Sequence, residues 1–391
     1  MAIRVAIDQT KHAKLASIQL LRAAAAIAVV FTHAITRLVY VFPDAASHSH
    51  LTGPNGQILA GDAGVDVFFV ISGFIMYFVH HNDFAVPGAS LKFLKKRLLR
   101  IVPFYWLLTT LAAAAILAVP NLMVTHGSEI SLSQIASSYL FLPMASRGST
   151  LSPIIGVGWT LDYEMFFYLV FACALFLPLR RGLLVIGALF VSAVGIGAII
   201  NPAGATARFF SDWLLLDFLM GVGIGWWSVT VGDMPAALRR CLILLALACL
   251  ALTLVWAPPE HGPLRFLFWG IPAALLVLGA CSADVPSSKL TDVGVTLGDA
   301  SYSIYLFQFF ALPAAAFLMR RAGLGKISFD VNVLILTGIV TVAGVGCWWF
   351  VERPLAKGLR RWKFGRQQRQ AHGAGALRAA AVPEPGPSFP E

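Results

Sequence analysis

Stretches of about 20 apolar residues recur along the chain, separated by short segments rich in charge, glycine or proline. They lie at 18–40, 61–80, 101–119, 156–178, 182–200, 209–228, 239–257, 264–283, 298–318 and 331–352. An α-helix of this length crosses the ~30 Å hydrocarbon core of a bilayer. The pattern therefore predicts an all-α polytopic integral membrane protein with about ten transmembrane helices.

Composition agrees with this fold class, since 58% of the 391 residues are hydrophobic and only 12% are charged. We expect a cytoplasmic segment at 1–17, one transmembrane domain at 18–352 and a cytoplasmic tail at 353–391. The tail is basic, then rich in alanine, glycine and proline, which predicts disorder. The five cysteines lie in apolar segments without a CxxC pair, so we expect free thiols and no metal site.

The distribution of lysine and arginine predicts the orientation. With a cytoplasmic amino terminus, most of them fall on cytoplasmic segments, which places both termini inside by the positive-inside rule. The loop at 320–326 disagrees, because it places three basic residues outside. The net charge of +10 and the basic tail predict contact with anionic lipid, and no base-stacking motif indicates nucleic acid.

Arg22 and His33 are ionisable residues inside the first apolar window. Eleven helical residues turn through nearly a whole number of turns and rise about 16 Å, so both side chains share one face at different depths. A charge at bilayer depth is costly unless it faces protein or water, which favours a functional role. The alternative is a snorkelling arginine with a hydrogen-bonded core histidine.

Depth arithmetic groups four ionisable residues. His33, Asp66, Glu164 and Asp217 all come out about 7–12 Å below the outer ends of their predicted helices. Four separate structural accidents at one depth are less plausible than one polar cavity opening towards the outer face. Trp159 and Asp162 stand in the same segment as Glu164 and are assigned to this substrate cavity.

A polar stripe follows the ninth window at Ser301, Tyr305 and Gln308. Its i, i+4, i+7 spacing places the three side chains on one helix face, where they either line the cavity or bond neighbouring helices. Gly221 and Gly225 form a GxxxG pair, for which close helix packing is the better interpretation.

Arg97 and Arg100 stand three residues apart in KKRLLRIVPFYW, next to the third window. Two guanidinium groups on one face suit a phosphate, although positive-inside anchoring alone explains basic residues here. A phosphate-bearing molecule held by Arg97, Arg100 and Arg22, with a long arm reaching towards His33, would bridge the ~16 Å between the two positions on the first helix. Coenzyme A is such a molecule.

Seven blocks, in order, resemble the acyltransferase family 3 membrane proteins: the Arg22–His33 pair, GVDVFFVISGFIM, KRLLRIVPFYW, WTLDYEMFFYL, DFLMGVGIG, SYSIYL and VERPL. WTLDYEMFFYL is particularly similar to the exopolysaccharide-production branch, which acetylates succinoglycan-type polymers. The resemblance implies a multi-pass O-acyltransferase of the bacterial inner membrane that uses acetyl-CoA and a polysaccharide or lipid-linked oligosaccharide acceptor. It also implies an essential His33 and supporting or donor-binding roles for Arg22, Arg97 and Arg100.

Acyl transfer to a sugar hydroxyl needs a general base, and histidine, with an unperturbed pKa of about 6.5, suits that task. We expect His33 to be the base and Asp66 or Glu164 to orient it; direct transfer and an acyl-histidine intermediate both stay open. Relatives commonly carry a histidine where this chain has Gln308, and an amide can bond a substrate but cannot titrate near neutral pH. The alternative functions are a glycan transporter or flippase, or a non-catalytic component of a polysaccharide assembly complex.

Overall fold

The computed structural model describes residues 2–47, 49–52, 63–118, 131–144, 153–232, 234–253, 258–259, 261–282 and 285–359. The predicted tail from residue 360 onward lies outside the described residues. The helices in chain order are α1 (Ala2–Val41), α2 (Pro43–Ala46), α3 (Ala63–His80), α4 (Ala89–Ala118), α6 (Leu132–Leu140), η1 (Gly156–Gly158), α7 (Trp159–Ala174), α8 (Leu179–Ile200), α9 (Ala205–Phe209), α10 (Leu214–Thr230), α11 (Ala236–Leu252), α12 (Pro263–Arg265), η2 (Phe266–Gly270), α13 (Ile271–Ala280), α14 (Lys289–Asp299), α15 (Ser301–Arg321), η3 (Leu324–Lys326), α16 (Phe329–Cys347) and η4 (Trp348–Glu352).

The helices confirm the predicted fold class. Among the described residues, eight helices are long and apolar enough to cross a membrane. The other two predicted windows correspond to α7 and α11, which are helical but only 16 and 17 residues long. The chain is therefore a multi-pass, helical membrane protein, while the number of crossings and the side of the termini stay predictions.

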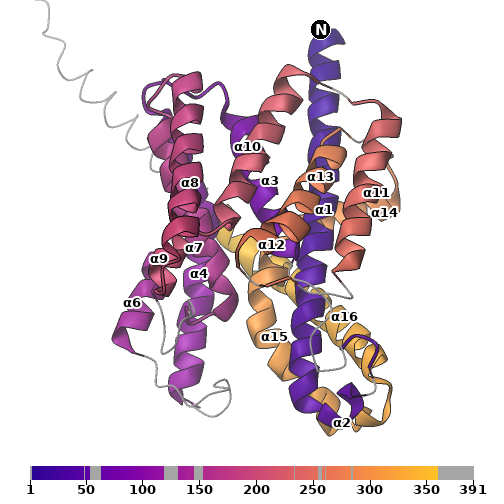
Figure 1. Ribbon diagram of the computed structural model, residues 1–391. Helices are drawn as coiled ribbons and strands as arrows, with labels where there is room; N and C mark the ends of the chain where they lie inside the picture. The colour runs from indigo at the N-terminus through magenta and orange to yellow at the C-terminus, as the bar shows by residue number, and fades with distance from the viewer. Residues whose placement is uncertain are drawn as a thin grey trace, which may run out of the picture.

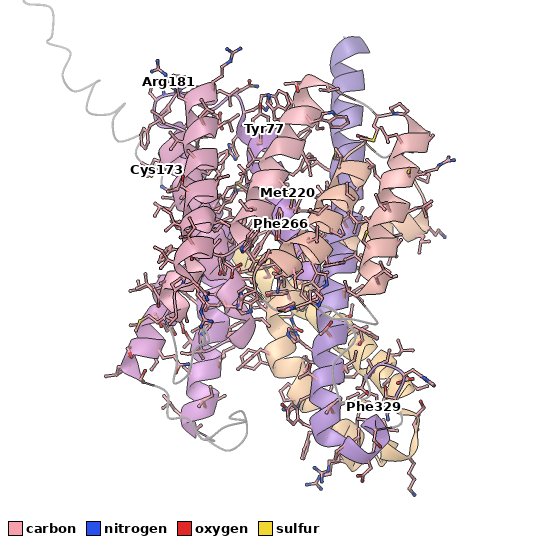
Figure 2. All side chains as sticks on the ribbon, in the orientation of Figure 1. Tyr77, Cys173, Arg181, Met220, Phe266 and Phe329 are labelled. Carbon is pink, nitrogen blue, oxygen red and sulfur yellow. The ribbon has the colours of Figure 1, made fainter. Side chains whose placement is uncertain are left out.

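The long helix α1 runs along the whole bundle from the amino-terminal end to α2 (Figure 1). On one side of the view α4, α6, α7, α8 and α9 gather, on the other α1, α11, α13, α14 and α16, with α3 and α10 between them (Figure 1). Arg181 lies at the end of the bundle where the chain begins, and Phe329 lies at the opposite end (Figure 2). The helices α8 and α16 therefore begin at opposite ends of the bundle.

The helices α3 and α10 touch through their backbones. A Cβ atom added at Gly221 would lie 2.0 Å from the carbonyl oxygen of Val70, and one added at Gly73 would lie 2.1 Å from that of Phe218. Any larger side chain at these glycines would force the helices apart. The close-packing interpretation of Gly221 is thereby confirmed.

Two helices begin earlier than the apolar windows predict. α1 starts at Ala2 instead of residue 18, and α4 starts at Ala89 instead of residue 101. An apolar window ends at the first cluster of charges, whereas the backbone ladder of a helix continues through charged residues at no cost. Arg97 and Arg100 consequently lie inside a 30-residue helix and not ahead of it.

Candidate active site

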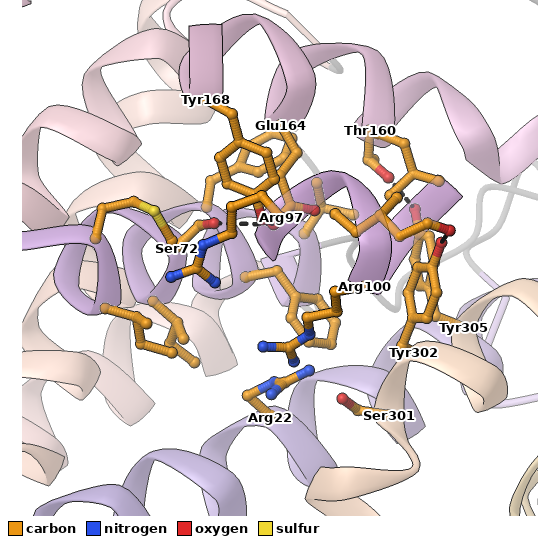
Figure 3. A pocket seen from close by; sticks show the side chains of 18 residues that line it. Arg22, Ser72, Arg97, Arg100, Thr160, Glu164, Tyr168, Ser301, Tyr302 and Tyr305 are labelled. Carbon is orange, nitrogen blue, oxygen red and sulfur yellow. Dashed lines mark hydrogen bonds between the residues drawn. The ribbon is translucent and has the colours of Figure 1, made fainter. Parts of the chain in front are cut away.

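One pocket lies between α1, α3, α4, α7 and α15 (Figure 3). It is lined by Arg22, Val65, Phe68, Phe69, Ile71, Ser72, Ile75, Met76, Arg97, Arg100, Ile101, Thr160, Leu161, Glu164, Tyr168, Ser301, Tyr302 and Tyr305. Most of these side chains are apolar or aromatic, and a few charged groups converge between them. That composition is typical of a binding site for a small organic molecule.

Three guanidinium groups point into this pocket, Arg22 from α1 and Arg97 and Arg100 from α4 (Figure 3). Arg97 is only 9% exposed, and its guanidinium carbon lies 5.6 Å from the ring centre of Tyr168. Its lysine neighbours on α4 are exposed, so positive-inside anchoring does not account for its position.

None of these arginines forms an ion pair with a carboxylate within the described part of the chain. Arg22 instead donates from Nη1 to Oε1 of Gln19 over 3.2 Å. Arranging three like charges around one space is unfavourable unless an anion occupies it. The pocket therefore has the electrostatics of a site for a ligand with several negative charges.

Glu164 is the acid of this pocket. Its Oε1 accepts a 3.0 Å hydrogen bond from Ser72 Oγ and another from the hydroxyl of Tyr168. In the described structure Oε2 has no hydrogen-bond partner, which leaves it available to a ligand.

Glu164 lines the arginine pocket and His33 is not among the residues that line it, so a cavity shared by the two stays a prediction. Depth arithmetic locates a residue along a helix but says nothing about the face it occupies.

His33 lies half-buried beside this pocket and is held by Gln308. The Gln308 amide donates from Nε2 to the backbone oxygen of Tyr305 over 2.8 Å, and a carbonyl can only accept. Gln308 Oε1 therefore faces His33 Nδ1 at 2.9 Å, and that nitrogen must be the donor. Nε2 of the neutral imidazole is then the unprotonated, basic nitrogen.

Tyr305 connects the two parts of the site. Its side chain lines the arginine pocket, while its hydroxyl donates to the backbone oxygen of Val157 over 3.1 Å and lies 2.9 Å from Thr160 Oγ1. Its backbone oxygen accepts from Gln308, the partner of His33. The polar stripe of α15 therefore serves both purposes that the sequence left open, since Ser301 and Tyr305 line the pocket and Gln308 bonds a neighbouring helix.

Asp66 does not orient His33. It forms a bidentate ion pair with Arg265, with Nη2–Oδ2 2.8 Å and Nε–Oδ1 3.2 Å. Neither Asp66 nor Asp217 lines the arginine pocket, although both were assigned to the cavity. Arg265 was missed, and its signal was a single arginine within an otherwise apolar window.

The remaining assigned residues lie outside the pocket lining. Trp159 stands edge-on to Tyr163, with ring centres 5.9 Å apart. Asp162 is 3% exposed, and its Oδ1 has no hydrogen-bond partner within the described structure. Ser72 and Tyr168 belong to the pocket but were not singled out, and the signal for Tyr168 was its i+4 spacing from Glu164.

Comparison with known proteins identifies the family of this chain. The family model of an acyltransferase domain matches residues 15–353. The chain is 36% identical over 314 residues, 78% of its length and 92% of the relative's, to the exopolysaccharide production protein ExoZ of Rhizobium meliloti (strain 1021). It is 26% identical over 305 residues, 74% of each chain, to BcsY of Komagataeibacter xylinus, whose name describes a membrane-bound transacylase. No solved structure matches. The chain therefore belongs to the acyltransferase 3 family of membrane proteins.

Proposed function

We propose that this protein is an O-acyltransferase of the bacterial inner membrane. It transfers an acyl group, acetyl in the simplest case, from acyl-CoA on the cytosolic side to a hydroxyl of an exported or cell-surface polysaccharide or its lipid-linked precursor. Family membership supports acyl transfer, and the name of ExoZ supports exopolysaccharide as the product class. The observation that carries the donor assignment is the convergence of three arginines without carboxylate partners in the described structure.

Coenzyme A fits the pocket by its chemistry. Arg22, Arg97 and Arg100 have no carboxylate partner in the described structure, and the phosphates of coenzyme A would supply anionic partners for them. Planar guanidinium groups bind phosphate through paired, charge-assisted hydrogen bonds. The free Oε2 of Glu164 can accept from an N–H or O–H of the donor.

The pantetheine arm is long, flexible and mostly apolar, which matches a pocket walled by the apolar face of α3. Because α1 is one continuous helix, His33 lies about 16 Å beyond Arg22, a distance such an arm can span.

His33 is proposed as the general base. Its Nε2 removes the proton of the acceptor hydroxyl as that oxygen attacks the thioester carbonyl carbon. The C–S bond then breaks, and the thiolate takes the proton from Nε2 of the His33 imidazolium. The products are the ester and free CoA thiol. Gln308 Oε1 holds the Nδ1 proton throughout and stabilises the imidazolium that forms.

The test uses the full-length protein in proteoliposomes with radiolabelled acetyl-CoA and an oligosaccharide acceptor. We expect label to appear on the acceptor as an alkali-labile ester. Movement of unlabelled oligosaccharide across the membrane without ester formation would favour the transporter function. Neither ester nor movement would favour a non-catalytic component of an assembly complex.

Gln308→Ala is expected to lower kcat about 10- to 100-fold, because a hydrogen bond to a group that becomes charged contributes roughly 1.5–3 kcal/mol. The donor KM should stay close to the wild-type value, since Gln308 does not line the arginine pocket. Initial rates at saturating acetyl-CoA measure the first effect. An unchanged kcat would show that His33 acts without this amide.

A further inference from the structure

Helix α3 supplies more of the pocket wall than any other helix, and one of its residues, Ser72, holds the pocket carboxylate of Glu164. A shift of α3 along its own axis would therefore move the pocket wall that this helix forms. A neighbouring face of α3, containing Asp66, Val70 and Gly73 at i, i+4 and i+7, is turned towards α10.

The contact between α3 and α10 combines close backbone approach at glycines with packing of aromatic side chains. The glycines bring the two backbones together, and the atoms nearest to a Cβ added at Gly73 or Gly221 belong to the backbone of the facing helix. Close contacts between small residues favour association, but they resist axial sliding weakly, because successive positions along a glycine surface are alike. Phe69 of α3 also stacks on Phe218 of α10, with ring centres 4.6 Å apart, and a directional contact between charged groups would fix the register of α3 further.

A fully buried charge cluster lies at the outer end of this contact. Arg265 is 3% exposed and Asp66 0% exposed, and both oxygens of the carboxylate accept from the guanidinium. The guanidinium also lies 4.9 Å from the ring centre of Trp269. Arg265 stands directly before the π-helical turn η2, a kind of distortion that often marks functional positions.

Asp217 completes the cluster from α10. It is 1% exposed and packs against the backbone of η2, where a Cβ atom added at Gly270 would lie 2.5 Å from its Oδ1. Neither of its oxygens has a protein donor within the described structure. Its interaction with Asp66 is that of two neighbouring carboxyl groups.

The charges of the cluster balance only with one proton. Two carboxylates and one guanidinium would leave a net negative charge buried at bilayer depth, which is costly. Asp66 already has the bidentate cation, so the proton belongs on Asp217, which can then donate to Asp66. The neutral cluster joins α3, α10 and the α12–η2 segment at one point.

We propose that Arg265, Asp66 and Asp217 are positioning residues that set the register of α3 and thereby place the pocket wall that carries Ser72. None of the three lines the pocket. The kinetic part of this inference rests on the proposed function, because donor use reports the position of the wall.

The first experiment measures donor KM and kcat for four variants of the full chain. Arg265→Gln and Asp66→Asn should raise the KM for acetyl-CoA about tenfold or more with a smaller change in kcat, because a displaced wall weakens binding of the donor. Asp217→Asn, which imitates a protonated carboxyl, should stay within about twofold of wild type. The double variant Asp66→Asn/Arg265→Gln should recover part of the loss, since it leaves no buried charge unpaired.

Arg239→Gln is the matched control. Arg239 also joins helical segments, donating from Nη1 to the backbone oxygen of Ser282 over 2.7 Å, but it does not lie on α3. Its KM should not change. An unchanged KM in Arg265→Gln, with only less folded protein, would overturn the positioning role. An Asp217→Asn variant as damaged as Asp66→Asn would overturn the placement of the proton.

A second measurement needs no turnover. The labelling rate of Ser72→Cys by a thiol reagent, compared with the native cysteines alone, reports the exposure of the pocket wall. Adding Arg265→Gln should change that rate several-fold, and adding Arg239→Gln should not. If wild-type protein transfers no acyl group, the proposed function fails, but this labelling still decides the positioning role. The labelling of Ser72→Cys also tests the positioning role if the Asp66→Asn variant does not accumulate in the membrane.

Discussion

Replacing His33 with alanine is expected to lower acyl transfer about 10²- to 10⁴-fold, the range associated with loss of a general base. The variant should still insert, because exchanging an imidazole for a methyl group makes the first span more apolar. The structure strengthens this expectation, since Gln308 presents His33 with Nε2 unprotonated. NMR of the purified polysaccharide from cells that carry only the variant measures the result as lost acetyl ester signals.

The control for this prediction is His81→Ala. His81 bonds the backbone oxygen of Phe78 just after the end of α3 and lines no part of the pocket. It should leave the ester signals unchanged. Wild-type ester signals in the His33 variant would rule out His33 as the base, and loss of the polymer itself would favour transport over acylation.

Removing the pocket arginines should impair use of the donor and spare use of the acceptor. Charge-assisted hydrogen bonds to phosphate contribute roughly 1.5–3 kcal/mol, so Arg97→Ala and Arg100→Ala should each raise the KM for acetyl-CoA about 10- to 100-fold. Arg97 is expected to have the larger effect, because it is buried and Arg100 is exposed. Initial rates at varied acetyl-CoA and fixed oligosaccharide measure both constants.

Lys92→Ala and Lys95→Ala are the matched controls, since both lysines lie on the same helix but are exposed and do not line the pocket. Their KM values should equal that of wild type. If all four variants change topology and none changes KM, the arginines serve positive-inside anchoring and the donor binds elsewhere.

Sequence patterns were reliable where the physics is local. The length of an apolar segment that crosses a membrane is set by the bilayer thickness, so the windows located the long apolar helices. The shorter helices α7 and α11 also appeared as windows. An ionisable residue in such a window is costly, so the sequence alone marked Arg22, Glu164 and other polar positions as a candidate site, while Arg97 was marked by its spacing from Arg100 beside a window. Six of the assigned residues line the pocket: Arg22, Arg97, Arg100, Glu164, Ser301 and Tyr305.

Grouping these residues needed the tertiary structure. The depth estimate placed His33, Glu164 and Asp66 in one layer, but the fold gives each a different partner, namely Gln308, Ser72 with Tyr168, and Arg265. Depth is one coordinate, and the rotation of each helix about its axis is another that an isolated window does not reveal.

By itself the sequence determined the helical membrane fold, the approximate spans and most of the polar residues of the pocket, because bilayer thickness and the cost of buried charge act on each segment separately. Only the tertiary structure decided that Gln308 holds His33, that Glu164 belongs with the arginines, and that Arg265 joins Asp66 and Asp217. Those partners are 92–275 residues apart for the hydrogen bonds of Glu164 with Ser72, Arg265 with Asp66, and His33 with Gln308. Helix packing, which depends on glycine contacts such as that of Gly221 with Val70, brings such distant segments together.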